Sequence, residues 1–565
     1  AASSVSCDAD FDAWTAPRNP GDELPLATNG GGDNGVLPYS AEPLGDWDKS
    51  YKDDGGIQQV HVSLAPQADT PGGLVVSFAS STLASQAGVR FHTSESQDER
   101  TAYAKATNYT HTTVANGGRY ESPNLYHTLL DAKCTDCTLY YTPFLSESAE
   151  APASGAMADG QRSVRIPALP SAFGGDVDQR FKLALVGDLG QTTNSIQTMQ
   201  HVTDEEDSIA ALLIMGDLSY ADNDDNRWDV WGRMFEHVLD HIPMTGLPGN
   251  HEIETDDWDG TSFRPYAHRF QNMPNCATCG GFVDPDGGWR ANMWHSFDIG
   301  SAHIIHVSSY HPYAAGTPQY TWLEEDLASV DRAKTPWIFV NLHAPWYNSN
   351  IAHQGEYQSY EVKKAWQPLL CAAGVNIMFA GHVHSYERIF PTCDNSTINA
   401  QTGITYINIG DGGNREGLYN HWLPGENGRR GPVWSAFREG SYGHGTLEVF
   451  NSTHALWEWH RNLDGDKVTR DSTWVLNYRN GDVGAEEEAA ARAAERESAA
   501  KEIAAQEQKP SQHQQRSAAV FGISAVVQVG ITAYAVTMTV LYMRLRRARR
   551  PLTKYENIEL DSVEL

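Results

Sequence analysis

The alternation of hydrophobic and polar positions divides the chain into several regions. Between 58 and 178, short apolar runs such as 60–64 and 74–78 alternate with polar positions and are separated by Gly, Asn and Ser. A period of two places successive side chains on opposite faces of a strand. We therefore expect an antiparallel, fibronectin-III-like β-sandwich over 58–178, preceded by an irregular arm rich in Gly, Asp and Pro over 1–57.

A different rhythm begins at 179, where strand-like apolar runs alternate with helical segments. In the segment 227–242, large apolar residues recur mostly three or four positions apart, as on one face of a helix. Alternating strands and helices are typical of an α/β architecture, in which helices cover the sheet. We expect an α/β sandwich of mixed β-sheets flanked by helices over 179–480. Its strand-like runs are 183–186, 211–215, 304–307, 337–340, 376–380 and 405–409.

The C-terminal part shows three further patterns. Residues 481–516 are rich in Ala, Glu, Arg and Lys without a coiled-coil seam, which predicts a charged helical stalk. Residues 517–543 carry no charge, and as a helix they would span roughly 40 Å, more than the ~30 Å hydrocarbon core of a bilayer. A buried core helix is the alternative, but such helices seldom have so long an uncharged run. We expect a transmembrane helix over 517–543 and, because five arginines follow it, a cytosolic tail over 544–565.

This topology places everything N-terminal to 517 in the lumen or outside the cell, as in a single-pass type I membrane protein. The chain begins with Ala, compatible with a removed signal peptide or a shortened chain, and we expect a signal peptide. An excess of 72 Asp and Glu over 41 Lys and Arg gives a net charge of −31, which argues against nucleic-acid binding. Three N-glycosylation sequons lie on the expected lumenal side, at Asn108, Asn395 and Asn451.

The seven cysteines include two C-x-x-C pairs, Cys134 with Cys137 and Cys276 with Cys279. A zinc ribbon would need both pairs, which lie far apart in the sequence. Local disulfides are the favoured interpretation in an oxidising compartment. The odd cysteine is unassigned, and Cys7 is the one we expect to remain unpaired; the other two are Cys371 and Cys393.

Polar side chains follow the strand-like runs of the expected α/β region. In open α/β sheets, ligands bind beyond the carboxyl ends of the strands. A single Asp after a strand is usually a turn former or a helix cap, but five such motifs in order, each with a metal-competent side chain, predict a metal site. Seven candidate ligands suit two ions that share one carboxylate. They are Asp188 in GDLG, Asp217 and Tyr220 in GDLSY, Asn250 in GNHE, His343 in NLH, and His382 and His384 in GHVH.

This ordered set of motifs resembles the purple acid phosphatases, a branch of the dinuclear metallophosphoesterases. Further stretches resemble the large, plant-type members, and the similarity covers roughly 57–478. The resemblance implies that Asp188, Tyr220 and His384 bind Fe³⁺, that Asp217 bridges, and that Asn250, His343 and His382 hold a divalent ion, either zinc, iron or manganese. The further stretches are 120–127, 347–349, 386–388, 410–417 and 442–445.

The resemblance also implies an acid phosphatase that hydrolyses phosphate monoesters by attack of a metal-bound hydroxide. His251 and His353 match the histidines with which the family binds phosphate, together with Asn250, and protonates the leaving group. One departure is Ala352, since the family often has adjacent histidines there. The alternatives are a phosphodiesterase or nucleotide pyrophosphatase on the same fold, and a non-catalytic membrane receptor, which would be expected to have lost ligands.

In the expected cytosolic tail, Tyr555-Glu-Asn-Ile558 resembles the Tyr-x-x-apolar signal that clathrin adaptors bind. Four-residue patterns of this kind are common by chance. Its position a short distance past the expected membrane helix favours a functional signal. The tail therefore predicts cycling between the plasma membrane and endosomes or lysosomes.

Overall fold

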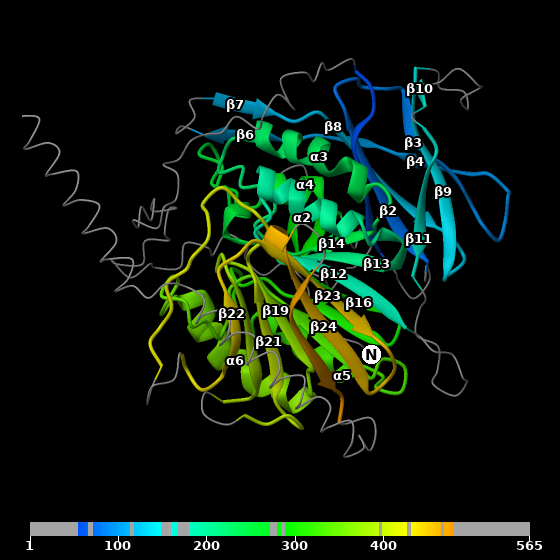
Figure 1. Ribbon diagram of the computed structural model, residues 1–565. Coiled ribbons are helices and arrows are strands. Elements are labelled where there is room, and N and C mark those ends of the chain that lie inside the picture. Colours follow the sequence, from blue (N-terminus) through cyan, green and yellow to red (C-terminus); the bar gives the residue numbers. More distant parts are fainter. Residues whose placement is uncertain are drawn as a thin grey trace, which may run out of the picture. The chain divides into compact units, whose positions relative to one another are not determined.

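The strands of the computed structural model form three large sheets and one two-stranded hairpin within the described residues (Figure 1). The two larger sheets provide the frame of the candidate site, and the third belongs to the N-terminal part. The structure describes residues 55–65, 72–113, 118–147, 157–158, 160–167, 180–271, 280–283, 289–394, 398–425, 431–464 and 468–478.

The ten-stranded sheet joins the N-terminal region to the α/β region. Its three central strands β12, β13 and β14 are parallel, and β1 adds to β14 in parallel, with Ser63 opposite Met244. In order, the strands are β25 (Thr469–Leu476), β24 (His454–Arg461), β23 (Gly443–Val449), β12 (Phe181–Val186), β13 (Ile209–Ile214), β14 (Met244–Gly246), β1 (Gln58–Leu64), β2 (Gly73–Ser80), β8 (Asn124–Asp131) and β5 (Ala106–Thr107).

A five-stranded sheet packs beside the strands that the N-terminal region contributes to the ten-stranded sheet. Buried side chains of both, including Phe78 and Val89, share one apolar cluster. The expected N-terminal β-rich region is therefore confirmed, while its fibronectin-III-like character stays a prediction. Its strands are β10 (Met157–Ala158), β9 (Cys137–Ser146), β3 (Gln86–Thr93), β4 (Arg100–Ala104) and β11 (Arg162–Ile166); β6 (Thr110–Thr113) and β7 (Gly118–Glu121) form the separate hairpin.

The eight-stranded sheet packs face to face on the ten-stranded one. Leu183 and Leu185 of β12 share an apolar cluster with Phe339 of β18, whereas Val186 and Val340 belong to a second cluster on the outer faces. This alternation is the period of two expected of strands buried on both faces. The order is β15 (Gly280–Val283), β16 (Trp289–Ile299), β17 (Ala302–His306), β18 (Trp337–Asn341), β19 (Ile377–Ala380), β21 (Ile404–Ile409), β20 (Tyr386–Thr392) and β22 (Ser435–Glu439).

Helices cover the outer faces, as the sequence predicts. The helix expected over 227–242 is α3 (Asn226–Leu239), which buries Trp228, Trp231 and Phe235 on one face. The expected α/β fold with mixed sheets is thereby confirmed. The remaining helices are α2 (Thr193–Thr203), α4 (Arg264–Arg269), α5 (Pro318–Ser329) and α6 (Tyr357–Ala373), and the short 3₁₀ turns are η2 (Glu206–Ser208), η3 (Asn250–Glu252) and η4 (Asn462–Asp464).

The described cysteines form disulfides, Cys134 with Cys137 and Cys371 with Cys393. The first confirms a local bridge within a C-x-x-C pair and removes two of the four thiolates that a zinc ribbon would need. Cys7, Cys276 and Cys279 lie outside the described residues.

Several predicted features fall on residues that the structure does not describe. These are residues 1–54 of the arm, Asn395, the stalk, the transmembrane helix, and the tail with Tyr555–Ile558. Among the described helices, none combines the length and apolar character required to cross a bilayer. Asn108 and Asn451 are exposed, so their side chains are accessible to a glycosylating enzyme.

Candidate metal centre

The loops that follow β12, β13, β14, β18 and β19 bring all seven candidate ligands to one place. Four of the seven have left-handed backbones, with φ of +54° at Asp188, +52° at Asp217, +52° at Tyr220 and +69° at His382. Each left-handed non-glycine residue costs about 1–2 kcal/mol, and such strain persists only where the surrounding structure enforces it. The chain therefore bends against its local preference at the residues whose side chains converge.

Two glycines before these residues allow the loops to approach one another. A Cβ at Gly381 would lie 2.4 Å from Asp188 Oδ2, and a Cβ at Gly216 would lie 2.5 Å from His343 Nδ1. Neither distance is compatible with a larger residue. The glycines that precede Asp217 and His382 in the sequence are thus required by the close packing of the loops.

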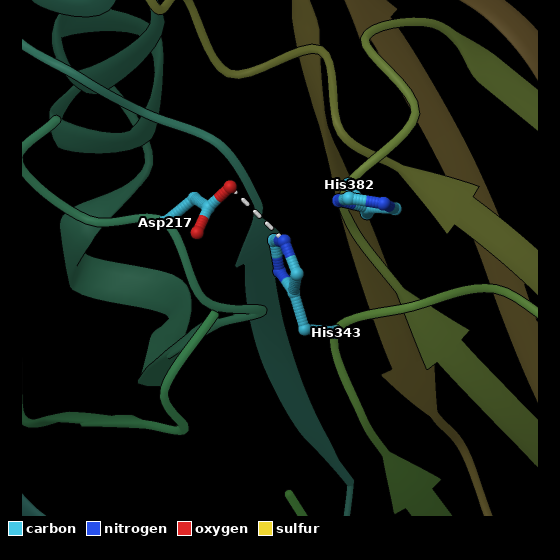
Figure 2. Close-up of side chains that lie close together, drawn as sticks. All are labelled: Asp217, His343 and His382. Carbon is cyan, nitrogen blue, oxygen red and sulfur yellow. Dashed lines mark ion pairs between the residues drawn. The ribbon is translucent and has the colours of Figure 1, made fainter. Parts of the chain in front are cut away.

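Asp217, His343 and Asn250 form the first group of converging ligand atoms, and Figure 2 shows the ion pair between Asp217 and His343. His343 Nδ1 donates to the Met215 carbonyl at 2.7 Å, so Nε2 is the nitrogen left to bind a cation. This Nε2 lies 3.0 Å from Asp217 Oδ2 and 3.1 Å from Asn250 Oδ1. Burial alone would lower the pKa of His343, but Asp217 and Asp188 raise it to about 9. The carboxylates therefore draw positive charge to the position where a metal ion would sit.

Asp188, Tyr220 and His384 form the second group. His384 Nδ1 donates to the Gly417 carbonyl at 3.0 Å, and its Nε2 lies 2.9 Å from the Tyr220 hydroxyl and 3.4 Å from Asp188 Oδ1. The Tyr220 hydroxyl donates to Asp188 Oδ1 at 3.0 Å. Burial raises the pKa of Tyr220 well above 10, and Asp188 and Asp217 raise it further. Only a strong cation would convert this phenol to a phenolate ligand.

Asp217 connects the two groups through a single oxygen. Its Oδ2 lies 3.0 Å from His343 Nε2 in the first group and 3.5 Å from the Tyr220 hydroxyl in the second. Burial would raise the pKa of Asp217, but the charges of His343 and His251 lower it, which favours the ionised form. This arrangement fits a carboxylate that bridges two cations.

His382 lies beside both groups. Its backbone N–H donates to Asp188 Oδ2 at 2.7 Å, and its ring lies 5.1 Å from that of His343 (Figure 2). Its Nε2 donates to Glu356 Oε2 at 2.7 Å, so Nδ1 remains available for a metal. Burial lowers the pKa of His382 to about 3, so the ring is neutral, as a metal ligand must be.

The two candidate catalytic histidines pack against different candidate ligands, and each contacts a different carboxylate. His251 packs its ring 4.0 Å from that of Tyr220, and its Nδ1 donates to Asp222 through a short hydrogen bond. His353 packs its ring 4.0 Å from that of His382, and its Nδ1 donates to Glu356 Oε1 at 2.7 Å. In each ring the carboxylate contacts Nδ1, so Nε2 makes no bond to that carboxylate.

Four acidic and aromatic residues of the site were not singled out from the sequence: Glu252, Tyr310, Asp222 and Glu356. Glu252, in the GNHE motif, accepts hydrogen bonds from the backbone N–H groups of Asp217 and Gly249, both at 2.8 Å, and so fixes two ligand loops together. The Tyr310 hydroxyl donates to Asn250 Oδ1 at 3.1 Å. Asp222 and Glu356 accept hydrogen bonds from the candidate catalytic histidines His251 and His353. Glu252 could have been found from its motif, whereas the others carry no local signal.

Comparisons with known proteins identify the family of the chain. Residues 181–386 match a family model described as calcineurin-like phosphoesterase, and 403–472 match one described as iron/zinc purple acid phosphatase-like protein C. Purple acid phosphatase 18 of Arabidopsis thaliana is 33% identical over 455 residues, covering 80% of this chain and 92% of the relative. Fe(3+)-Zn(2+) purple acid phosphatase 12 of the same plant is 35% identical over 437 residues, covering 74% and 84%.

A solved structure shares the fold. The structure of a purple acid phosphatase isolated from yellow lupin (Lupinus luteus) seeds matches with a TM-score of 0.63 at 18% identity, covering 76% of each chain. At this identity the match supports the architecture alone, and the sequence relatives support the family. The chain belongs to the purple acid phosphatase family, and the predicted hydrolase class is confirmed.

Proposed function

We propose that this chain hydrolyses phosphate monoesters at a centre of Fe³⁺ and a second divalent metal. The observation that carries the proposal is Asp217 Oδ2, which reaches His343 Nε2 at 3.0 Å and the Tyr220 hydroxyl at 3.5 Å. One carboxylate oxygen within reach of two groups of ligand atoms suits a two-metal centre. The iron/zinc family model and the Fe³⁺–Zn²⁺ relative support both metals.

The residue assignment follows from ligand chemistry. Asp188, Tyr220 and His384 would hold Fe³⁺, because a hard phenolate oxygen suits a hard trivalent ion. Asn250, His343 and His382 would hold the divalent ion, Zn²⁺, Fe²⁺ or Mn²⁺. Asp217 would bridge. When bound, the two ions would clamp phosphate oxygens and activate water as the nucleophile.

The protein's own groups then act on the substrate. Burial would lower the pKa of His251, but Asp217 and Asp222 raise it well above 6.5, which favours the protonated form that would bind the phosphate. Asn250 has an amide nitrogen that can donate to a phosphate oxygen. No described residue forms a hydrogen bond with Nε2 of His353, which lies at the half-buried edge of the site, where it would protonate the departing alkoxide.

Purified protein with its native metals tests the assignment. We expect two metals per chain, iron among them, a visible phenolate-to-Fe³⁺ charge-transfer band, and hydrolysis of phosphate monoesters in preference to diesters. Tyr220→Phe removes one oxygen and little volume, so the fold should remain while the band disappears. Full activity with two metals and no visible band would contradict the Fe³⁺–Tyr220 assignment. Preferential hydrolysis of diesters or nucleotide pyrophosphates would replace the proposed reaction with that of the same-fold alternative.

We also propose that the catalytic region faces the lumen or the cell exterior on a membrane anchor formed by 517–543. The uncharged length of that segment, the arginines after it, and the exposure of Asn108 and Asn451 support this topology. Tyr555–Ile558 would then be read by clathrin adaptors from the cytosol. Sealed vesicles carrying tags at both ends of the chain test the orientation, since only the C-terminal tag should be digested by external protease when the cytosolic face is outward. Digestion of the N-terminal tag there would overturn it.

A further inference from the structure

Tyr419 lies between the two loops that carry His384 and His353. Its backbone N–H donates to the His384 carbonyl at 2.9 Å. Its carbonyl accepts a hydrogen bond from Asn350 Nδ2 at 2.9 Å, three residues before His353. The main chain at Tyr419 is therefore tied both to a candidate metal ligand and to the loop of the candidate leaving-group acid.

The ring of Tyr419 contacts both histidines. It stacks on His384 with ring centroids 4.7 Å apart and an interplanar angle of 5°, and it lies 5.5 Å from the ring of His353 at 56°. The ring is half-buried, and no described residue forms a hydrogen bond with its hydroxyl. Its contribution to the site therefore comes from the ring rather than from the phenolic oxygen.

His353 needs such support because its backbone is strained. Its φ is +57°, in the left-handed region that a residue with a Cβ disfavours. It follows Ala352 on an exposed turn, between Ile351, which is 54% exposed, and Gln354. A histidine on such a turn keeps one orientation only if other groups hold its ring, and the described groups that do so are Glu356, His382 and Tyr419.

We propose that Tyr419 is a positioning residue that holds His353 in the orientation from which it protonates the leaving group. The inference rests on the proposed function. It goes further by assigning a role to a residue that neither touches the reacting phosphorus nor binds metal. Because a general acid acts only within hydrogen-bond reach of the leaving oxygen, a loosened His353 should matter most for esters whose leaving group needs the proton.

A series of monoesters with leaving groups of increasing pKa, assayed with the metal-loaded protein, tests the proposal. Tyr419→Ala should slow esters of alkyl alcohols roughly tenfold, a part of the ~10²–10⁴ that a general acid contributes, and leave activated aryl esters near the wild-type rate. Tyr419→Phe keeps the ring and should restore the wild-type dependence on leaving group. Tyr419→Leu keeps apolar volume without a ring and should behave like Tyr419→Ala, which guards against misfolding of the smaller variant. Tyr360→Ala, which removes a 63% exposed tyrosine on α6, is the control and should match wild type.

Three results would overturn the proposal. An equal rate loss on all esters would indicate a role in phosphate binding or in the metal site. Loss of metal from Tyr419→Leu would show that the residue only supports His384. A Tyr419→Phe variant as slow as Tyr419→Ala would assign the effect to the hydroxyl. Failure of the proposed function is distinguishable from these outcomes, because the wild-type protein would then hydrolyse none of the monoesters.

Discussion

The two candidate catalytic histidines differ in how their carboxylate partners are used. The side chain of His251 is 6% exposed, and its partner Asp222 also accepts a short hydrogen bond from Arg415. The side chain of His353 is 21% exposed, and its partner Glu356 gives its other oxygen to His382. One carboxylate is held beside a guanidinium and serves one imidazole, whereas the other is shared between two imidazoles.

This difference suits two different tasks. Near His251, Asp217 Oδ2 lies 3.8 Å and Glu416 Oε1 lies 3.7 Å from Nε2, so three carboxylates favour a permanent charge. A fixed charge can bind an oxyanion but is a poor proton donor. His353 lies at the edge of the site, where it can exchange a proton with solvent after each turnover. We infer that burial and the number of carboxylates, rather than the residue type, separate phosphate binding from proton transfer.

The largest effect that would test this comparison is expected from removal of the proposed proton donor, His353. His353→Ala should slow the hydrolysis of alkyl monoesters by ~10²–10⁴-fold. Activated aryl esters, whose leaving group needs no proton, should be hydrolysed close to the wild-type rate. Steady-state rates over a leaving-group series measure this, with metal content as the control. A uniform loss across the series would make His353 a phosphate ligand and abolish the distinction.

Removal of the fixed charge should give the opposite signature. His251→Ala should lower kcat/KM for every monoester by ~10²–10³-fold, as loss of one oxyanion donor does in other hydrolases. Inhibition by inorganic phosphate should weaken in this variant and not in His353→Ala. If the loss followed leaving-group pKa instead, the roles of the two histidines would have to be exchanged.

Neutralising the two carboxylates sharpens the comparison. Glu356→Gln should cost roughly 10–100-fold in activity and should also lower the divalent-metal content, because outer partners of metal ligands contribute on that scale and Glu356 contacts His382. Asp222→Asn should weaken phosphate inhibition and leave metal content unchanged. Metal analysis measures the metal content of both variants, and titration with inorganic phosphate measures the inhibition. Equal metal loss in the two variants would mean that both carboxylates merely support the fold.

A third histidine provides a reference outside the site. His303 donates to Asp298 at 2.7 Å and to Asp326 at 2.9 Å. Burial would lower its pKa, but these two carboxylates raise it to about 9. Because the folded-state pKa of His303 is above the unfolded value of about 6.5, the interaction of protonated His303 with the two carboxylates stabilises the fold fully below about pH 6.5. This stabilisation is lost as the pH rises through about 9.

His303→Gln should therefore lower the free energy of unfolding by about 1–2 kcal/mol at pH 6 and by less near pH 10. Denaturant unfolding at the two pH values measures this. A destabilisation that is independent of pH would show that the two carboxylates do not keep the ring of His303 protonated. It would also weaken the argument that nearby carboxylates keep His251 protonated.

The sequence determined the candidate ligand set because this set is encoded locally. Each candidate ligand follows a strand, and the glycines before Asp217 and His382 permit the close approach of the loops. The carboxyl ends of parallel strands meet at one edge of each sheet, the ten-stranded sheet for β12, β13 and β14 and the eight-stranded sheet for β18 and β19. The fold class followed from the same periodicities, of two in the strands and of three to four in α3. Both can be read without knowledge of distant contacts.

The tertiary structure alone decided which side chains support those ligands and how the regions join. Glu356 reaches His382, 26 residues away, and Tyr419 reaches both His353 and His384, because loops from separate strands fold over one edge of the sheet. The N-terminal region, expected as a sandwich over 58–178, shares the ten-stranded sheet through the pairing of β1 with β14. No local pattern specifies such a pairing, because a strand's hydrophobic period fixes which face is buried but not which distant strand lies beside it.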